Sequence, residues 1–250
     1  MEFIVPEWKD APDNIGAMVT TRRGGVSHAP FDDGYGGGGL NLGTHVGDRT
    51  EDVAQNRARL RDAIPAEPAW LTQVHGVNVV DAATVRDTPE ADASFSTHSG
   101  TVCVVQTADC LPVLFCDMNG KVVASAHAGW RGLANGVLEN TVHQMRKAGA
   151  GDIAAWLGPA IGPDRFEVGQ DVRDVFLAAD VDMAEAFKPL PDTPGKYLAD
   201  IYTLARRRLT NVGVERISGG GFCTMSDERR FYSYRRNPQT GRMASLIWII

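Results

Sequence analysis

The stretch QTADCLPVLFCDMNGKVVASAHAGWRGL, residues 106–133, contains two apolar runs joined by the polar link Asp-Met-Asn-Gly at 117–120. Two such runs around a short link of turn-forming residues predict a β-hairpin. If the two ends of the link pair with each other, Cys110 lies directly opposite His127. If Asn-Gly instead forms a type I′ turn, His127 faces Pro112 and Cys110 becomes its diagonal neighbour. Both registers bring a thiol and an imidazole together at one end of the hairpin.

Further elements are predicted on both sides of this hairpin from apolar runs and amphipathic periodicity. The expected strands are residues 70–82, 100–110, 152–158 and 244–250, and the expected helices are residues 45–64, 131–149 and 198–213. Asp48 and Glu51 have the spacing of a capping box in the first helix, and Asp200 is the expected N-cap of the last one. Because strands and helices follow one another in irregular order, we expect one α/β domain over residues 1–250 with antiparallel strand pairs.

The composition limits the partners and the compartment. The chain has 250 residues and a net charge of −6, so it lacks the basic excess that a nucleic-acid partner requires. No apolar run is long enough to cross a bilayer, and the first ten residues lack the regions of a secretory signal. The four cysteines have no regular spacing and do not indicate a disulfide scaffold. We therefore expect a cytoplasmic protein without a nucleic-acid or membrane partner, and the sequence favours no oligomeric state.

The thiol and the imidazole of the hairpin raise the question of a metal site. A thiolate and an imidazole suit Zn²⁺ better than a hard cation. Taken singly, Cys110 and His127 can equally be a core thiol and a hydrogen-bonded histidine. A zinc site needs a third ligand, for which His75, beside Gly76 at a strand entrance, competes with His45. His143 in an expected helix and His98 in a polar loop are expected to face solvent, so neither is a candidate for the third ligand.

Seven motifs follow one another along the chain: TTRRGGVS, LNLGTHVGD, TQVHG, TADCLPVLF, AHAGWRGL, GPAIGPDRFEVG and CTMSDERRFYSYRRNPQTGRMASLI. In this order they resemble the YfiH-like family, whose members carry the labels polyphenol oxidase, laccase domain protein and purine nucleoside phosphorylase. Together they span nearly the whole chain, so the resemblance is specific. It implies a single-domain mixed α/β sandwich.

The resemblance also implies ligands and a reaction. The family binds zinc through its QVHG histidine, its ADC cysteine and its AHAGW histidine, which fall here on His75, Cys110 and His127. It implies phosphorolysis of adenosine, inosine, guanosine and methylthioadenosine, with purine nucleosides and phosphate as partners, and deamination of adenosine. The glycine-rich segment 32–39 departs from the family pattern. We expect residues 34–39 to be mobile and to border the site.

Four further residues are candidates for handling the substrate. Three ligands leave a fourth zinc position open, where water would be acidified. Because HAG lacks the glutamate of H-x-E deaminases, Asp109 is the candidate proton carrier, or else a partner that orients a ligand. Phosphate would bind at the helix N-terminus around 129–131, near Arg131, or to Arg22. Asn41 would either bind substrate hydroxyls or cap a turn.

Three other functions compete with this interpretation. A copper polyphenol oxidase would use many histidines in His-x-His pairs, whereas this chain has six histidines and no such pair. An amidase that edits cell-wall precursors would use the same zinc-bound water. A zinc-stabilised binding module would present four protein ligands, and only three are evident. We therefore expect catalysis.

Overall fold

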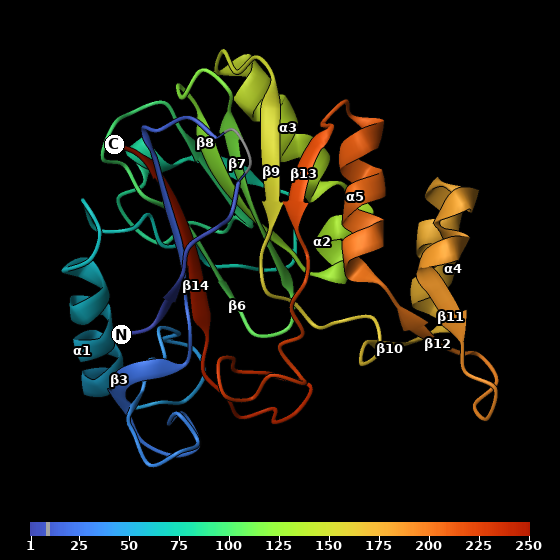
Figure 1. Ribbon diagram of the computed structural model, residues 1–250, viewed down its shortest axis with the longest axis horizontal. Helices are drawn as coiled ribbons and strands as arrows, with labels where there is room; N and C mark the ends of the chain where they lie inside the picture. The colour runs from blue at the N-terminus through green and yellow to red at the C-terminus, as the bar shows by residue number, and fades with distance from the viewer. Residues whose placement is uncertain (9–10) are drawn as a thin grey trace.

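A computed structural model describes residues 1–8 and 11–250, in which two β-sheets pack together between outer helices (Figure 1). The four-stranded sheet is antiparallel, with the order β1 (Phe3–Ile4), β2 (Ile15–Thr20), β14 (Met243–Ile249) and β6 (Cys103–Thr107). The six-stranded sheet has the order β13 (Arg216–Gly219), β9 (Ile153–Leu157), β7 (Leu111–Asp117), β8 (Val123–Ala128), β5 (Ala93–Ser96) and β4 (Val79–Asp81). Within it, only the pairs β13–β9 and β4–β5 of the described strands are parallel.

The remaining elements surround these sheets. A small antiparallel sheet has the order β10 (Glu167–Gly169), β12 (Lys196–Ala199) and β11 (Phe187–Pro189), and β3 (Arg23–Ser27) makes isolated bridges to Gly39. The helices are α1 (Thr50–Arg61), α2 (Trp130–Asn135), α3 (Val137–Lys147), α4 (Gln170–Ala179) and α5 (Ile201–Asn211), with 3₁₀ turns η1 (Ala82–Thr84) and η2 (Val181–Ala186). Figure 1 shows α4 beside the small sheet, apart from α1 on the opposite side. This arrangement confirms the expected mixed α/β sandwich with antiparallel strand pairs.

Three apolar layers hold the sandwich together. Leu114 of β7 and Ile247 of β14 are fully buried in the layer between the two sheets. On the outer face of the six-stranded sheet, Phe115 packs in one cluster with Leu138 of α3. On the outer face of the four-stranded sheet, residues of α1 such as Leu60 join a third cluster. Each sheet is therefore apolar on both faces, which explains why its strands read as nearly continuous apolar runs.

The hairpin of β7 and β8 has the second of the two expected registers. Pro112 pairs with His127, as the type I′ alternative predicts. The turn itself is different, because Asn119 does not adopt the positive φ that a type I′ turn requires. Instead, the Asp117 carboxylate accepts hydrogen bonds from the backbone N–H groups of Lys121 and Val122, at 2.6 and 2.8 Å. A side chain thus fixes the register that we attributed to the turn backbone.

Two of the expected helices differ in their boundaries. The helix expected at 131–149 is interrupted at Gly136, which has φ 99° and separates α2 from α3. The helix expected at 45–64 begins at Thr50, and its N-cap Arg49 makes no side-chain cap. The predicted capping box is wrong because the Asp48 carboxylate accepts hydrogen bonds from other segments, including the Ser27 hydroxyl at 2.6 Å. The predicted cap of α5 is confirmed: Asp200 accepts from the second and third residues of that helix.

The strand expected at 70–82 is regular only over β4. Earlier in the expected strand, His75 has φ 59°, a left-handed conformation that breaks a strand. The backbone N–H groups of Val74, His75 and Gly76 donate to the carboxylate of Asp92 instead of a neighbouring strand. The apolar pattern identified this segment as buried, but it did not reveal that a side chain satisfies its backbone.

Among the described residues, no helix is long and apolar enough to span a membrane.

Candidate active site

The site lies where the chain passes from one sheet of the sandwich to the other. β6 ends at Thr107, and β7 begins at Leu111 in the second sheet, so three residues make the crossing. Asp109, in the middle of the crossing, has φ 88° and turns the chain sharply. Cys110 follows directly and is therefore held at the start of β7.

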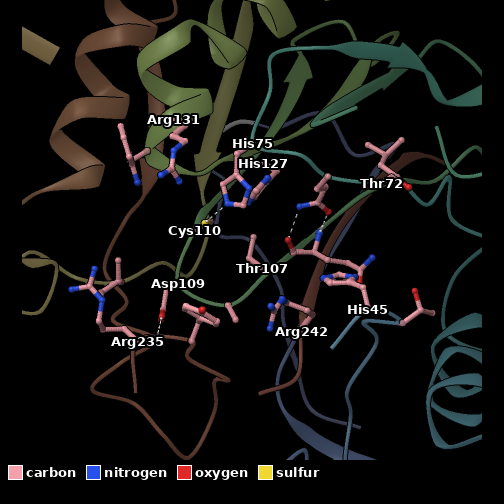
Figure 2. A pocket seen from close by; sticks show the side chains of 18 of the residues that line it. His45, Thr72, His75, Thr107, Asp109, Cys110, His127, Arg131, Arg235 and Arg242 are labelled. Carbon is pink, nitrogen blue, oxygen red and sulfur yellow. Dashed lines mark hydrogen bonds between the residues drawn. The ribbon is translucent and has the colours of Figure 1, made fainter. Parts of the chain in front are cut away.

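His75, Cys110 and His127 come together at this crossing, as the sequence predicted (Figure 2). Their ligand atoms all lie within 4.8 Å of one another. Cys110 Sγ is 3.6 Å from His75 Nε2, and the two imidazole rings are 4.7 Å apart between centroids, edge to face. His127 is buried in β8, whereas His75 is exposed on its loop. The third-ligand alternative, His45, is not part of the cluster.

The spacing of these atoms fits a metal ion. Zinc bonds of about 2.3 Å to sulfur and about 2.0–2.1 Å to nitrogen place tetrahedral sulfur and nitrogen ligands about 3.5 Å apart. The separation of 3.6 Å between Cys110 Sγ and His75 Nε2 agrees with that geometry. Among the described residues, these three form the one group of at least three His, Cys, Asp or Glu side chains that could hold an ion. Three ligands would leave a tetrahedral ion one open position.

Asp92 organises two of the three ligands and was not identified from the sequence. Its carboxylate is fully buried, and His127 Nδ1 donates to Oδ1 at 2.7 Å. The backbone N–H of His75 donates to the same oxygen at 3.0 Å, and the N–H of Gly76 donates to Oδ2 at 2.7 Å. One carboxylate therefore orients the His127 ring, leaves its Nε2 free for a metal, and stabilises the left-handed loop that carries His75.

The charges of the cluster are coupled. Burial alone would raise the pKa of the Cys110 thiol, but the positive charge and hydrogen bond of His127 lower it to about 6. Burial opposes charge on His127 too, yet the Cys110 thiolate and the hydrogen bond to Asp92 raise its pKa. The pKa of Asp92 is held below its usual value by His127 and the backbone donors, although burial would raise it. The cluster thus favours a thiolate, which is the form of cysteine that binds metal.

Gly129 makes room for the ligands. A Cβ atom at this position would lie 2.6 Å from His75 Cδ2 and 3.1 Å from Cys110 Sγ. The first distance is too short for any side chain, and both atoms belong to candidate metal ligands. The glycine of the AHAGW motif is therefore required by the close approach of these two side chains.

A cavity of about 740 Å³ opens over the cluster. Its size falls within the range of pockets for small molecules. Its walls carry aromatic side chains, namely Trp70, Trp130, Phe166 and Tyr234, and basic ones, namely Arg57, Arg131, Arg235 and Arg242. The cavity thus offers flat apolar faces and positive charge on either side of a potential metal ion.

Asp109 and Arg131 line this cavity. The carboxylate of Asp109, however, is already occupied: Oδ1 accepts from the Thr224 hydroxyl, and Oδ2 accepts from the Ser233 hydroxyl and the backbone N–H of Arg235. Of the two roles expected for Asp109, these contacts favour that of a positioning residue. The guanidinium of Arg131 lies 4.5 Å above the ring of Trp130. The helix that begins there, α2, has only six residues, so its N-terminus is a weaker anion site than the expected long helix.

Arg22 and Asn41 lie outside the residues that line the cavity. The Arg22 guanidinium is largely buried and donates to the backbone carbonyls of Asp32 and Glu228. The Asn41 side chain is fully buried, accepts from the N–H groups of Gly43 and Arg242, and donates to Asp48. Their hydrogen-bonding groups thus bind the protein itself. Neither residue presents a free hydrogen-bonding group to this cavity, and the contacts of Asn41 fit the turn-capping alternative.

The glycine-rich segment 34–39 also lies away from the cavity. Gly37 and Gly38 border a separate shallow hollow near the N-terminus. The Asp33 carboxylate accepts from the N–H groups of Tyr35 and Gly37, at 2.8 and 2.9 Å. The expectation that this segment borders the site is therefore wrong.

The sequence and the structure also match known proteins. Residues 16–250 match the family model described as multi-copper polyphenol oxidoreductase laccase. A purine nucleoside phosphorylase of Pseudomonas aeruginosa is 54% identical over 247 residues, which cover 99% of this chain and 98% of that protein. The purine nucleoside phosphorylase YfiH of Escherichia coli is 52% identical over 252 residues, covering 100% and 99% of the two chains.

Solved structures give the same result. The crystal structure of a Neisseria meningitidis protein, 47% identical in sequence, has a TM-score of 0.92 and covers 100% of this chain and 99% of its own. The structure of YlmD from Geobacillus stearothermophilus, 30% identical, has a TM-score of 0.82 and covers 100% and 97%. The protein therefore belongs to the YfiH-related family described as multi-copper polyphenol oxidoreductase laccases.

Proposed function

We propose that this protein is a zinc-dependent purine nucleoside phosphorylase that acts on adenosine, inosine, guanosine and methylthioadenosine and also deaminates adenosine. The observation that carries the proposal is the convergence of His75, Cys110 and His127 on a cavity of nucleoside size. Two relatives that match along their full length and are more than half identical are named purine nucleoside phosphorylases. Their names support nucleosides and phosphate as the substrates here.

Zinc suits this donor set, since one thiolate and two imidazoles at tetrahedral spacing are ligands that it prefers. When bound, Zn²⁺ would supply Lewis-acid character at the open fourth position. The protein's own contribution is orientation: Asp92 accepts the proton on His127 Nδ1, so that the lone pair of Nε2 faces the ion. A multicopper centre would require further groups of ligands, which the described residues do not contain. We therefore do not propose polyphenol oxidase activity, despite the description of the family.

In phosphorolysis, a phosphate oxygen forms a bond to C1′ of the ribose while the bond from C1′ to the base nitrogen breaks. The base leaves with the electron pair and takes up a proton, which yields free base and the sugar 1-phosphate: ribose 1-phosphate, or 5-methylthioribose 1-phosphate from methylthioadenosine. The protein must hold two anionic or polar reactants side by side and stabilise the developing charge. Trp130 and Arg131 both line the cavity, where Trp130 offers aromatic surface to the planar base and the guanidinium stacked on its ring offers donors to the substrate. Asp109 holds the 233–235 segment and the turn before Cys110, and thereby positions the ligand.

The experiment is to incubate the zinc-loaded protein with adenosine, inosine and methylthioadenosine, with and without phosphate, and to separate the products by chromatography. Phosphate-dependent release of free base is the expected result, together with phosphate-independent formation of inosine and ammonia from adenosine. Cys110→Ala should abolish both reactions, whereas Cys223→Ala, which changes a cysteine outside the cavity, should retain them. Absence of every product in metal-loaded protein would refute the proposal. Hydrolysis of a cell-wall peptide precursor under the same conditions would then identify the amidase.

A further inference from the structure

The cavity is positively charged although the chain carries a net charge of −6. Four arginines line it, and among the described residues none of the four forms an ion pair with a carboxylate. Asp109 is the one carboxylate among the lining residues, and both of its oxygens already accept hydrogen bonds from the protein. Unpaired arginines in a cavity of an acidic protein leave room for an anionic ligand.

Three of the basic groups gather at the end of the cavity beside α1. Arg57 projects from α1, with its guanidinium 3.8 Å above the ring of Trp70 and Nε donating to the Leu42 carbonyl. Arg242 precedes β14 and donates through one terminal nitrogen to the carbonyls of Thr240 and Gly241. These contacts fix both arginines while other N–H groups of each guanidinium make no hydrogen bond with the described residues. His45 belongs to the same end, next to Arg242 (Figure 2).

Arg57 and Arg242 contact the same residue, since Arg57 donates to the Leu42 carbonyl and the Leu42 N–H donates to the Arg242 carbonyl. The pKa of His45 is lowered by burial and further by the positive charges of Arg242 and Arg57. Burial likewise lowers the pKa of Arg57 and of Arg242. An anion at this end would therefore meet two guanidinium groups whose charge burial disfavours, and would stabilise that charge. Arg131 and Arg235, by contrast, are exposed and lie on the other side of the metal ligands in Figure 2.

Gln106 adds a group of different chemistry to this end of the cavity. It is only 7% exposed, and its Oε1 atom is buried without a hydrogen-bond partner among the described residues. In the sheet, Gln106 pairs with Ala244, so Arg242, two residues before Ala244, is its diagonal neighbour on the same face. The backbone of Gln106 is fixed by two hydrogen bonds with the Gln73 side chain, at 2.7 and 2.8 Å. Gln106 also lines the cavity, so a ligand bound there can supply the hydrogen-bond partner that its amide lacks.

We propose that Arg57, Arg242 and His45 form a subsite for inorganic phosphate, in which Gln106 Oε1 accepts the proton that phosphate carries. Hydrogen phosphate has an O–H group at neutral pH, whereas sulfate has the same shape and charge without a proton. The arginines bind either anion, and the acceptor distinguishes between them. The inference deepens the proposed phosphorylase, on which it rests, by assigning the end of the cavity that holds the second substrate.

The test is calorimetric titration of the zinc-loaded protein with inorganic phosphate and, separately, with sulfate. Phosphate should bind roughly tenfold more tightly than sulfate, which is the effect of one buried acceptor left facing an oxygen without a proton. Arg242→Ala should weaken both anions by about tenfold or more, as expected for lost charge-assisted hydrogen bonds. Arg235→Ala is the matched control, because it removes the same charge from the opposite side of the cavity, and it should change either affinity less than about threefold.

Gln106→Leu tests the discriminating group. It should weaken phosphate by about tenfold and leave sulfate unchanged, so that the two anions bind equally. If both anions weaken together, Gln106 donates to the anion instead and its assigned role is wrong. If Arg235→Ala and Arg242→Ala weaken phosphate equally, the cavity exerts a general field and contains no subsite at this end. Arg242→Gln, with retained zinc content as the check, replaces Arg242→Ala if that variant fails to fold.

Failure of the subsite and failure of the function give different results. If nucleosides are cleaved but the KM for phosphate is unchanged in Arg242→Ala, the subsite is refuted and the phosphorylase stands. If phosphate binds with the expected pattern but no nucleoside is cleaved, the phosphorylase is refuted and the subsite stands.

Discussion

Replacing Asp92 with asparagine should weaken zinc binding although Asp92 does not belong to the ligand set. Its two carboxylate oxygens face four N–H groups: those of His127 and His75 on one side, and those of Val74 and Gly76 on the other. Asparagine has one oxygen and one NH₂ group, so one side must face a donor. If the NH₂ faces His127 Nδ1, it forces the ring proton onto Nε2, the atom that binds the metal.

The magnitude follows from these contacts. Loss of an orienting partner typically costs about 10- to 100-fold in metal affinity, or about 1.4–2.7 kcal/mol. If the asparagine turns the other way, the N–H groups of Val74 and Gly76 lose their acceptor, which costs about 1–3 kcal/mol of stability and loosens the loop of His75. Both orientations therefore weaken zinc binding, the first through His127 and the second through His75.

Competition against a chromophoric chelator measures the zinc affinity, and urea unfolding measures the stability. The matched control is Asp117→Asn, at the far end of the same hairpin. Asp117 is also fully buried and accepts from three backbone N–H groups, so the variant should lose stability but bind zinc like the parent. Unchanged zinc affinity in Asp92→Asn, or equal loss in both variants, would refute the orienting role.

Three further predictions concern the cluster and its surroundings. In metal-free protein, the rate at which iodoacetamide alkylates Cys110 should fall as the pH drops through about 6, because His127 stabilises the thiolate against the opposing effect of burial. His127→Gln should move the midpoint of this pH dependence upward. Gly129→Ala should reduce zinc affinity by about tenfold or more, because the new Cβ displaces two ligands. Gly221→Ala, whose new Cβ has no atom within 4 Å, should leave the affinity unchanged. Native mass spectrometry measures the zinc content of both variants. Arg22→Ala should lower the melting temperature and reduce phosphorolysis and deamination in parallel at full zinc content, because Arg22 binds backbone carbonyls. Selective loss of phosphorolysis would instead indicate that Arg22 binds phosphate.

The hairpin and its two candidate metal ligands could be predicted from the sequence because both depend on local patterns. Two apolar runs and a turn signal bring Cys110 and His127 together whichever register forms, and the QVHG motif added His75. Asp92 had no such signal: it lies 17 residues from His75 and 35 from His127 and acts through backbone groups that only the folded loop presents. Its neighbours in sequence, Ala91 and Ala93, show nothing but burial.

The sequence could not show which polar side chains bind the protein itself. Arg22 stands in a motif of the family and has the charge for phosphate, but nothing in a sequence shows that backbone carbonyls already bind its guanidinium. The opposite case concerns Arg57 and Arg242, which a sequence cannot distinguish from ordinary surface arginines until packing brings them into one cavity. Long-range packing decides such cases, and composition and spacing carry no information about it.

The two sheets of the sandwich contribute different halves of the cavity. The hairpin with His127 and Cys110 belongs to the six-stranded sheet, whereas Gln106 lies in the four-stranded sheet and Arg242 enters it. The apolar layer between the sheets, which includes Leu114 and Ile247, therefore works as a spacer that sets the reach from the metal ligands to the opposite wall. Enlarging or trimming a side chain in that layer changes the separation of the two halves without altering any residue that meets a ligand, because packed interiors transmit such strain. The distance between the metal ligands and the opposite wall thus depends on positions that do not line the cavity at all.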